Sequence, residues 1–152
     1  MPCWKHRYDV SRVCMQGEPV HLPAKLAVTL ALIFHELATN AAKYGALSTQ
    51  RGRLAVSWVT NGREIAIDWR ESGGPPAVAP TQSGFGKRLF ERGLDPFRGQ
   101  VETQFCADGF VCTITTLVMD DRVGQSHAGG AKHSLPGTPA WNDVLHRRGN
   151  CT

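Results

Sequence analysis

The sequence has no long apolar run and no apolar leader. Its longest apolar stretch, residues 26–37, already contains His35 and Glu36, and it falls short of the ~18 uncharged residues that a membrane span needs. The first residues, which include Lys5 and His6, lack the apolar core of a signal peptide. We therefore expect no membrane span and a cytoplasmic location.

Basic clusters and metal-binding spacings are also scarce. The formal net charge is only +4 over 152 residues, and no basic run is interleaved with aromatic residues, so nucleic acid is not expected as a ligand. No two of the 5 cysteines have the C-x-x-C spacing of a zinc or redox site. The tail histidines His127, His133 and His146 are too irregularly spaced for a metal site. What remains is a globular chain of the right length for one domain with a hydrophobic core.

The first part of the chain is expected to form a strand and a long helix. Residues 10–22 resemble a short strand, a turn at residues 17–19 and an extended return. A helix is expected over residues 24–46, where Gly45 is placed to end it. Its apolar residues recur at helical spacing and predict one buried stripe: Leu26, Leu30, Ile33, Leu37 and Tyr44.

The remainder of the chain predicts two hairpins with a short helix between them. Residues 53–59 and 64–69 alternate around Asn61-Gly62, a strong signal for a tight turn. Residues 70–83 are a loop, residues 87–94 a short helix, and residues 100–118 a hairpin that turns at Asp108-Gly109. We expect an extension over residues 1–9, one domain over 10–119, and a mobile tail over 120–152, which has few large apolar residues.

One face of the predicted long helix carries polar residues. Glu36, Asn40 and Lys43 are spaced four and three apart, so they share a face beside the apolar stripe. An asparagine inside a helix is mildly unfavourable, so helix stability gives no reason for Asn40. The face is either part of a functional cleft or a solvated edge with a Glu36–Asn40 hydrogen bond, and spacing alone does not decide between them.

Two glycine-containing segments follow. Glu71 stands where a strand ends, before Gly73 and Gly74, and such glycines let the backbone approach a ligand closely. A carboxylate there can accept a hydrogen bond from an exocyclic amine, although a polar loop with a tight turn is the better explanation of this segment taken alone. Residues 84–88, Gly-Phe-Gly-Lys-Arg, open the short helix, where free backbone N–H groups favour a phosphate. A simple capped helix is the alternative explanation.

Taken together, the three segments resemble the N box and the two glycine boxes of the GHKL ATP-binding fold, which histidine kinases share with gyrase. Residues 35–48, HELATNAAKYGALS, are similar to the N box of the HWE histidine kinases. That family is named for a histidine in this box, here His35, and for a W-x-E motif, here Trp69 and Glu71. The resemblance covers about residues 10–119. It implies an α+β fold, a two-layer α/β sandwich with a mixed, mainly antiparallel sheet and helices on one face.

The resemblance also implies a site for ATP and Mg²⁺. Asn40 would coordinate the metal, Glu71 would accept a hydrogen bond from adenine, and Glu36 would be the catalytic residue that polarises the attacking group. Residues 76–83 would form a lid over the nucleotide, and His35 would either orient the site or pack. The remaining nucleotide-binding residues would be Lys43, Tyr44, Gly73, Gly84, Gly86 and Lys87, with Arg88 as an alternative source of charge.

The implied function is that of the ATP-binding catalytic domain of a two-component histidine kinase. The γ-phosphate would pass to a histidine outside this chain, and a response regulator would act downstream. His6-Arg7 is not followed by the x-K-N of the family's acceptor site, so we expect the acceptor domain in a partner chain or in a part that is missing here. A non-catalytic ATP-binding regulatory module and a serine kinase of the anti-sigma-factor type, which shares the fold, remain as alternatives.

Overall fold

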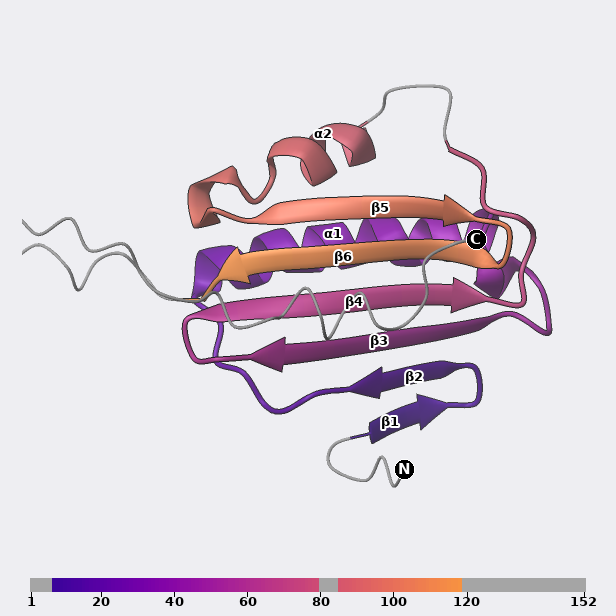
Figure 1. The fold of residues 1–152 in the computed structure, drawn as a ribbon, viewed down its shortest axis with the longest axis horizontal. Helices are drawn as coiled ribbons and strands as arrows, with labels where there is room; N and C mark the ends of the chain where they lie inside the picture. The colour runs from indigo at the N-terminus through magenta and orange to yellow at the C-terminus, as the bar shows by residue number, and fades with distance from the viewer. Residues whose placement is uncertain (1–6, 80–84, 119–152) are drawn as a thin grey trace, which may run out of the picture. The chain divides into compact units, whose positions relative to one another are not determined.

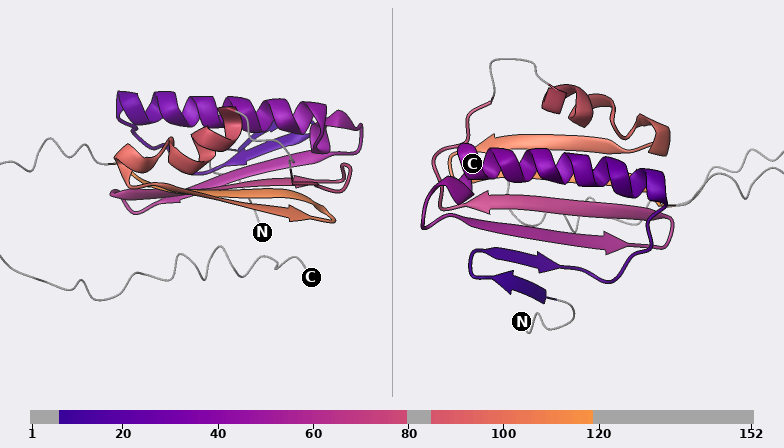
Figure 2. Two further views of the ribbon diagram at one scale, coloured as in Figure 1. Left: turned by 90° about the horizontal axis from the view of Figure 1, so that it is seen from above. Right: turned by 180° about the vertical axis from the view of Figure 1, so that it is seen from behind.

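The described residues form two layers, a sheet and a helical layer on one of its faces. The computed structural model describes residues 7–79 and 85–118. Their sheet has six strands in the order β1-β2-β3-β4-β6-β5 (Figure 1). Figure 2 shows both helices, α1 and α2, on the same side of this sheet. The sheet is mixed, since β2 and β3 run parallel while the other pairs are antiparallel. The expected fold class is therefore confirmed.

The N-terminal hairpin differs from the expected strand and turn. Strand β1 spans Arg7–Val10 and β2 spans Val13–Gln16, and the chain turns between them at Ser11, whose φ is 50°. The expected turn at residues 17–19 is wrong, because this segment instead leads from β2 towards the long helix. Strand β2 is held by parallel pairing with β3, in which Val13 lies opposite Leu54. Because the paired residues are far apart in the chain, no local sequence pattern predicts that β2 and β3 lie side by side.

Helix α1 spans Ala24–Lys43 and buries the predicted stripe through Leu37. The stripe then continues with Ala41, whereas Tyr44 is 74% exposed, so its assignment to the core is wrong. The reason is that α1 ends three residues earlier than expected. Both Tyr44 and Gly45 donate their backbone N–H groups to the carbonyl oxygen of Asn40. A short 3-10 turn, Ala46–Ser48, follows. No helix among the described residues is long and apolar enough to cross a membrane.

The central hairpin forms as predicted. Strands β3, Arg53–Thr60, and β4, Glu64–Ser72, are joined at Asn61-Gly62, where Asn61 Oδ1 accepts hydrogen bonds from two backbone N–H groups. The helix-facing side of the pair supplies the core residues Leu54, Val56, Ile65, Ile67 and Trp69. Strand β4 extends past the predicted end, so Glu71 belongs to the strand rather than to a loop.

The second half of the fold adds α2 and the last hairpin. Helix α2 spans Phe85–Arg92 and so begins before residue 87, where it was expected. After a 3-10 turn, Asp95–Phe97, strands β5, Gln100–Cys106, and β6, Gly109–Leu117, form the predicted hairpin. Strand β6 lies between β5 and β4 and brings Cys112 and Ile114 into the core. The expected tail, and the second half of the expected lid, lie outside the described residues.

Candidate functional site

Glu71 lies near the end of β4, with its side chain on the same face as Trp69. Its carboxylate is buried, with the residue 7% exposed. Oε2 accepts a hydrogen bond of 2.9 Å from the backbone N–H of Ala46, and Oε1 accepts one of 3.0 Å from Nε1 of Trp69. These two donors satisfy the charge that burial would otherwise make costly. A carboxylate offers about four lone-pair positions, so Glu71 can still accept a bond from a ligand.

The end of α1 approaches this carboxylate very closely. A Cβ atom built on Gly45 would lie 2.0 Å from Glu71 Oε2 and 2.9 Å from the Cα of Ala41. No side chain fits in that space. Gly45 is therefore needed for the close approach of the helix end to β4, in addition to the helix-ending role expected from the sequence.

The glycines after β4 rest on the segment that follows α1. Gly73 has a φ of 71°, a backbone conformation that favours glycine, and its carbonyl oxygen accepts a hydrogen bond of 3.3 Å from Oγ1 of Thr49. A Cβ atom on Gly74 would lie 2.5 Å from the Cα of Ala46. The segment 45–52 thus packs against Gly73 and Gly74 next to Glu71. We call this packed region the corner.

The polar face of α1 ends at the same corner. Asn40 is exposed, and its backbone carbonyl accepts the two N–H groups that end the helix. Within residues 7–79 and 85–118, no hydrogen bond joins the side chains of Glu36 and Asn40, so the face lacks the bond that the solvated-edge alternative included. Lys43, one turn further along, is exposed as well. The amide of Asn40 is therefore available to a ligand from solvent.

Glu36 and the first turn of α2 are neighbours. A Cβ atom on Gly86 would lie 3.2 Å from Oε2 of Glu36. Lys87 is exposed and its Nζ lies 3.8 Å from Oε1 of Glu91, a surface pair that binds the lysine only weakly. The structure thus brings Glu36 and Gly86 together and leaves Lys87 at the surface, while Gly84 lies outside the described residues.

The amide oxygen of Asn40 is compatible with a magnesium ion that is held mainly by phosphates and water. Magnesium bound with phosphates takes few protein oxygens and keeps several waters. The exposed amide oxygen of Asn40 offers one such ligand. In the part of the chain that the structure describes, no group of three or more His, Cys, Asp or Glu side chains forms a metal cage.

Trp69 has a role that the W-x-E motif alone did not indicate. Its indole donates to Glu71 and stacks on Phe34 of α1, with ring centroids 6.2 Å apart. The signal was present in the spacing, since residues i and i+2 of a strand point to the same face. The contribution of the Ala46 backbone N–H had no sequence signal.

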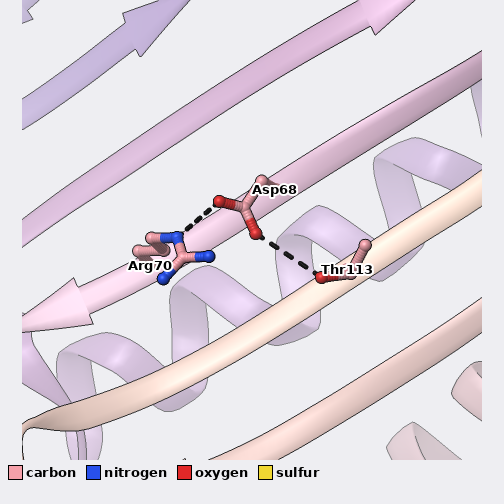
Figure 3. A network of polar contacts seen from close by, with 3 residues as sticks. All are labelled: Asp68, Arg70 and Thr113. Carbon is pink, nitrogen blue, oxygen red and sulfur yellow. Dashed lines mark hydrogen bonds and ion pairs between the residues drawn. The ribbon is translucent and has the colours of Figure 1, made fainter. Parts of the chain in front are cut away.

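The opposite face of the sheet carries a separate polar cluster. Figure 3 shows Asp68 between Arg70 of the same strand and Thr113 of β6. Nε of Arg70 and Oγ1 of Thr113 donate to the two carboxylate oxygens of Asp68, the latter at 3.4 Å. Because Asp68 and Glu71 point to opposite faces of β4, this cluster is not part of the candidate site.

Comparison with known proteins relates the chain to one group of kinases. No protein-family model matches it. Blue-light-activated histidine kinase 1 of Erythrobacter litoralis is 36% identical over 122 residues, which cover 78% of this chain and 33% of that protein. The blue-light-activated histidine kinase of Brucella ovis is 33% identical over 109 residues, which cover 68% of this chain and 22% of that protein. The chain thus spans a third or less of the length of these relatives.

Solved structures share the fold. The histidine kinase domain of the Erythrobacter litoralis EL346 blue-light activated histidine kinase matches with a TM-score of 0.60 at 17% identity, over 70% of this chain and 51% of that one. Histidine kinase ThkA, in complex with response regulator protein TrrA, matches with a TM-score of 0.50 at 14% identity, over 70% of this chain and 33% of that one. With the sequence relatives, these matches identify the chain as a histidine kinase catalytic domain of the HATPase fold, related to the HWE-type blue-light-activated histidine kinases.

Proposed function

We propose that this domain binds Mg²⁺·ATP at the corner formed by the end of α1, residues 45–52, the end of β4 and the first turn of α2. The observation that carries the proposal is the hydrogen bond between Glu71 Oε2 and the backbone N–H of Ala46. This bond links Glu71 on β4, the residue proposed to recognise the adenine base, to the end of the helix that bears Asn40. Residues from separate segments of the chain thereby converge on one solvent-facing edge.

Glu71 would read the base. Its carboxylate is held in one place by two donors and retains lone pairs for a third. The 6-amino group of adenine is such a donor. A 6-oxo base would instead present an acceptor to the carboxylate and be disfavoured. Gly73 and Gly74 would let the backbone lie close to the base, with exposed Tyr44 near the nucleoside.

The phosphate end would lie along the polar face of α1. Asn40 would hold Mg²⁺, which neutralises charge on the phosphates when it is bound. Lys43 and Lys87 would add positive charge, and Gly84 and Gly86 would present backbone N–H groups at the start of α2. Positioning and charge neutralisation are most of what phosphoryl transfer needs. Glu36, which contacts the first turn of α2, would polarise the attacking group.

The phosphate would pass to a histidine outside this chain, and from there to a response regulator. Support for the regulator comes from ThkA, a kinase of similar fold that was solved in complex with one. Support for the histidine comes from the relatives, which are named as histidine kinases and of which the matched part is only 33% and 22%.

Calorimetric titration of Mg²⁺·ATP tests the binding site. Wild-type protein should bind in a magnesium-dependent manner, and Asn40→Ala should weaken this binding by roughly tenfold or more, the effect of losing about 1.4 kcal/mol. Thr29→Ala is the matched control, because Thr29 lies on the same helix, three turns from Asn40, and bonds only to the backbone of Lys25. Folded wild-type protein that binds no Mg²⁺·ATP would contradict the proposal.

The residue that accepts the phosphate is identified by the acid and alkali stability of the phosphoprotein. The domain is incubated with radiolabelled ATP and with the rest of the Erythrobacter litoralis kinase, supplied as a separate chain without its own catalytic domain. A phosphoprotein that is stable to alkali and labile to acid would support a phosphohistidine. The reverse stability would favour the serine kinase alternative, and binding without transfer would favour a regulatory module.

A further inference from the structure

We infer that Trp69 is a positioning residue for base selection. Its indole N–H and the backbone N–H of Ala46 together fix the carboxylate of Glu71 in one orientation. This inference rests on the proposed nucleotide function and assigns a task to a residue that does not itself touch the nucleotide.

Trp69 is held rigidly. It is 4% exposed in the core beneath α1, and Phe34 of that helix stacks against its ring at an interplanar angle of 22°. Because Trp69 and Glu71 lie two residues apart on the same face of β4, the indole N–H points along the strand at Oε1. A ring packed on one side by Phe34 cannot turn away without disturbing the core.

The second carboxylate oxygen is held from the opposite side. Ala46 donates to Oε2, and this oxygen packs so closely against Gly45 that a Cβ atom built there would lie 2.0 Å away. With a donor at each oxygen, rotation of the carboxylate is opposed at both ends. A glutamine could not replace it, because its NH₂ group would face one of the two N–H donors.

A Glu71 carboxylate held in one orientation can distinguish a 6-amino base from a 6-oxo base. Its remaining lone pairs favour a 6-amino group and oppose a 6-oxo group only while they point at that position. If the indole donor is lost, the carboxylate can turn. Discrimination between the two bases then falls, while binding of the phosphates, which other residues contact, changes little.

The test compares Mg²⁺·ATP with the magnesium complex of inosine triphosphate, whose base carries a 6-oxo group. In wild-type protein and in Trp69→Phe, both dissociation constants are measured by calorimetry. Phenylalanine retains an aromatic ring but has no N–H. Since the variant loses a hydrogen bond to a charged group, we expect the preference for ATP to fall by roughly tenfold or more.

Two control variants separate positioning from general damage. Trp58→Phe removes another indole N–H, which donates to the carbonyl of Glu18 at 2.7 Å, outside the site. Phe34→Leu removes the ring that holds the indole but keeps the indole donor, so the preference for ATP should fall less than in Trp69→Phe. Trp58→Phe should retain the wild-type preference for ATP. An unchanged preference in folded Trp69→Phe would overturn the inference, and so would an equal fall in either control.

A measurement without nucleotide keeps the inference separate from the proposed function. In ¹⁵N–¹H spectra, the indole signal of Trp69 is the one that disappears in Trp69→Phe. Glu71→Gln should shift this signal and leave that of Trp58 in place. If the Trp69 signal does not move, the hydrogen bond is absent and the positioning role is overturned. Wild-type protein that shows this hydrogen bond but binds neither nucleotide would overturn the proposed function and, with it, the assignment to base selection.

Discussion

At the scale of single residues, Glu71 serves both the fold and the proposed site. A buried carboxylate is tolerated when hydrogen bonds satisfy it, and here the donors come from β4 and from the segment after α1. The W-x-E spacing made the position of Glu71 predictable from the sequence. Its burial was not predictable, because the Ala46 donor depends on how the chain leaves α1.

Glu71→Ala should destabilise the domain whether or not nucleotide is present. It leaves two buried N–H groups without acceptors, and each unsatisfied group costs about 1–3 kcal/mol. We expect a loss of at least about 2 kcal/mol in the free energy of unfolding, measured with urea. Glu64→Ala, at an exposed position on the same strand, should change it by less than about 0.5 kcal/mol. Equal effects of the two substitutions would mean that the Glu71 hydrogen bonds do not stabilise the fold.

Cys112 predicts a pH dependence of stability. Burial, and secondarily the nearby charge of Asp68, raise the pKa of its thiol from 9.0 to about 12. Between these values the unfolded chain loses this proton while the folded protein keeps it, so the unfolded state binds fewer protons and stability falls as pH rises. Cys112→Ala should therefore show a flatter decline of the unfolding free energy above pH 9 than wild-type protein. Parallel curves would argue against the raised pKa.

At the scale of elements, local patterns predicted most of the fold. Alternation and turn residues located both long hairpins, and the helical repeat located the buried face of α1. The end of α1 was placed three residues too late, because Tyr44 and Gly45 both donate to the carbonyl oxygen of Asn40 and close the helix at Lys43. The β1–β2 hairpin was missed because its turn at Ser11 lacks glycine and proline, and because β2 is stabilised by β3 far along the sequence.

The contact between α1 and α2 can be tested at Gly86. Alanine is about 1 kcal/mol better than glycine inside a helix, so Gly86→Ala alone would be expected to stabilise α2. The new Cβ atom would lie 3.2 Å from Oε2 of Glu36, which must move by a few tenths of an ångström. We therefore expect a smaller gain in Tm in the wild-type background than in Glu36→Ala. Equal gains in a double-mutant cycle would show that the two residues are not coupled.

At the scale of the whole molecule, charge and burial act on different parts of the proposed site. The chain has a net charge of +4, and the exposed cations Lys43 and Lys87 flank the proposed phosphate position, whereas Glu71 is buried. Salt screens exposed charges more strongly than buried ones. Affinity and base preference should therefore respond differently to ionic strength.

Raising the salt concentration from about 0.05 to about 0.5 M shortens the Debye length from roughly 14 to 4 Å. The affinity for Mg²⁺·ATP should fall severalfold, because the phosphates are attracted by exposed lysines. The ratio of the ATP and inosine triphosphate affinities should stay constant, since salt does not reach Glu71. Calorimetry at both salt concentrations measures the two affinities. If their ratio falls together with the affinity for Mg²⁺·ATP, the group that recognises the base is exposed to solvent and is not the buried Glu71.

The parallel pairing of β2 with β3 also has a consequence for the order of folding. Val13 and Leu54 become partners only after α1 and the turn behind it have closed the loop between them. Contacts of long sequence separation form late, because the entropy of loop closure opposes them. The hydrogen bond between Ala46 and Glu71, by contrast, joins residues only 25 apart in sequence. We therefore expect this bond to form before the N-terminal hairpin docks, so that the end of α1 is joined to β4 without waiting for the edge of the sheet.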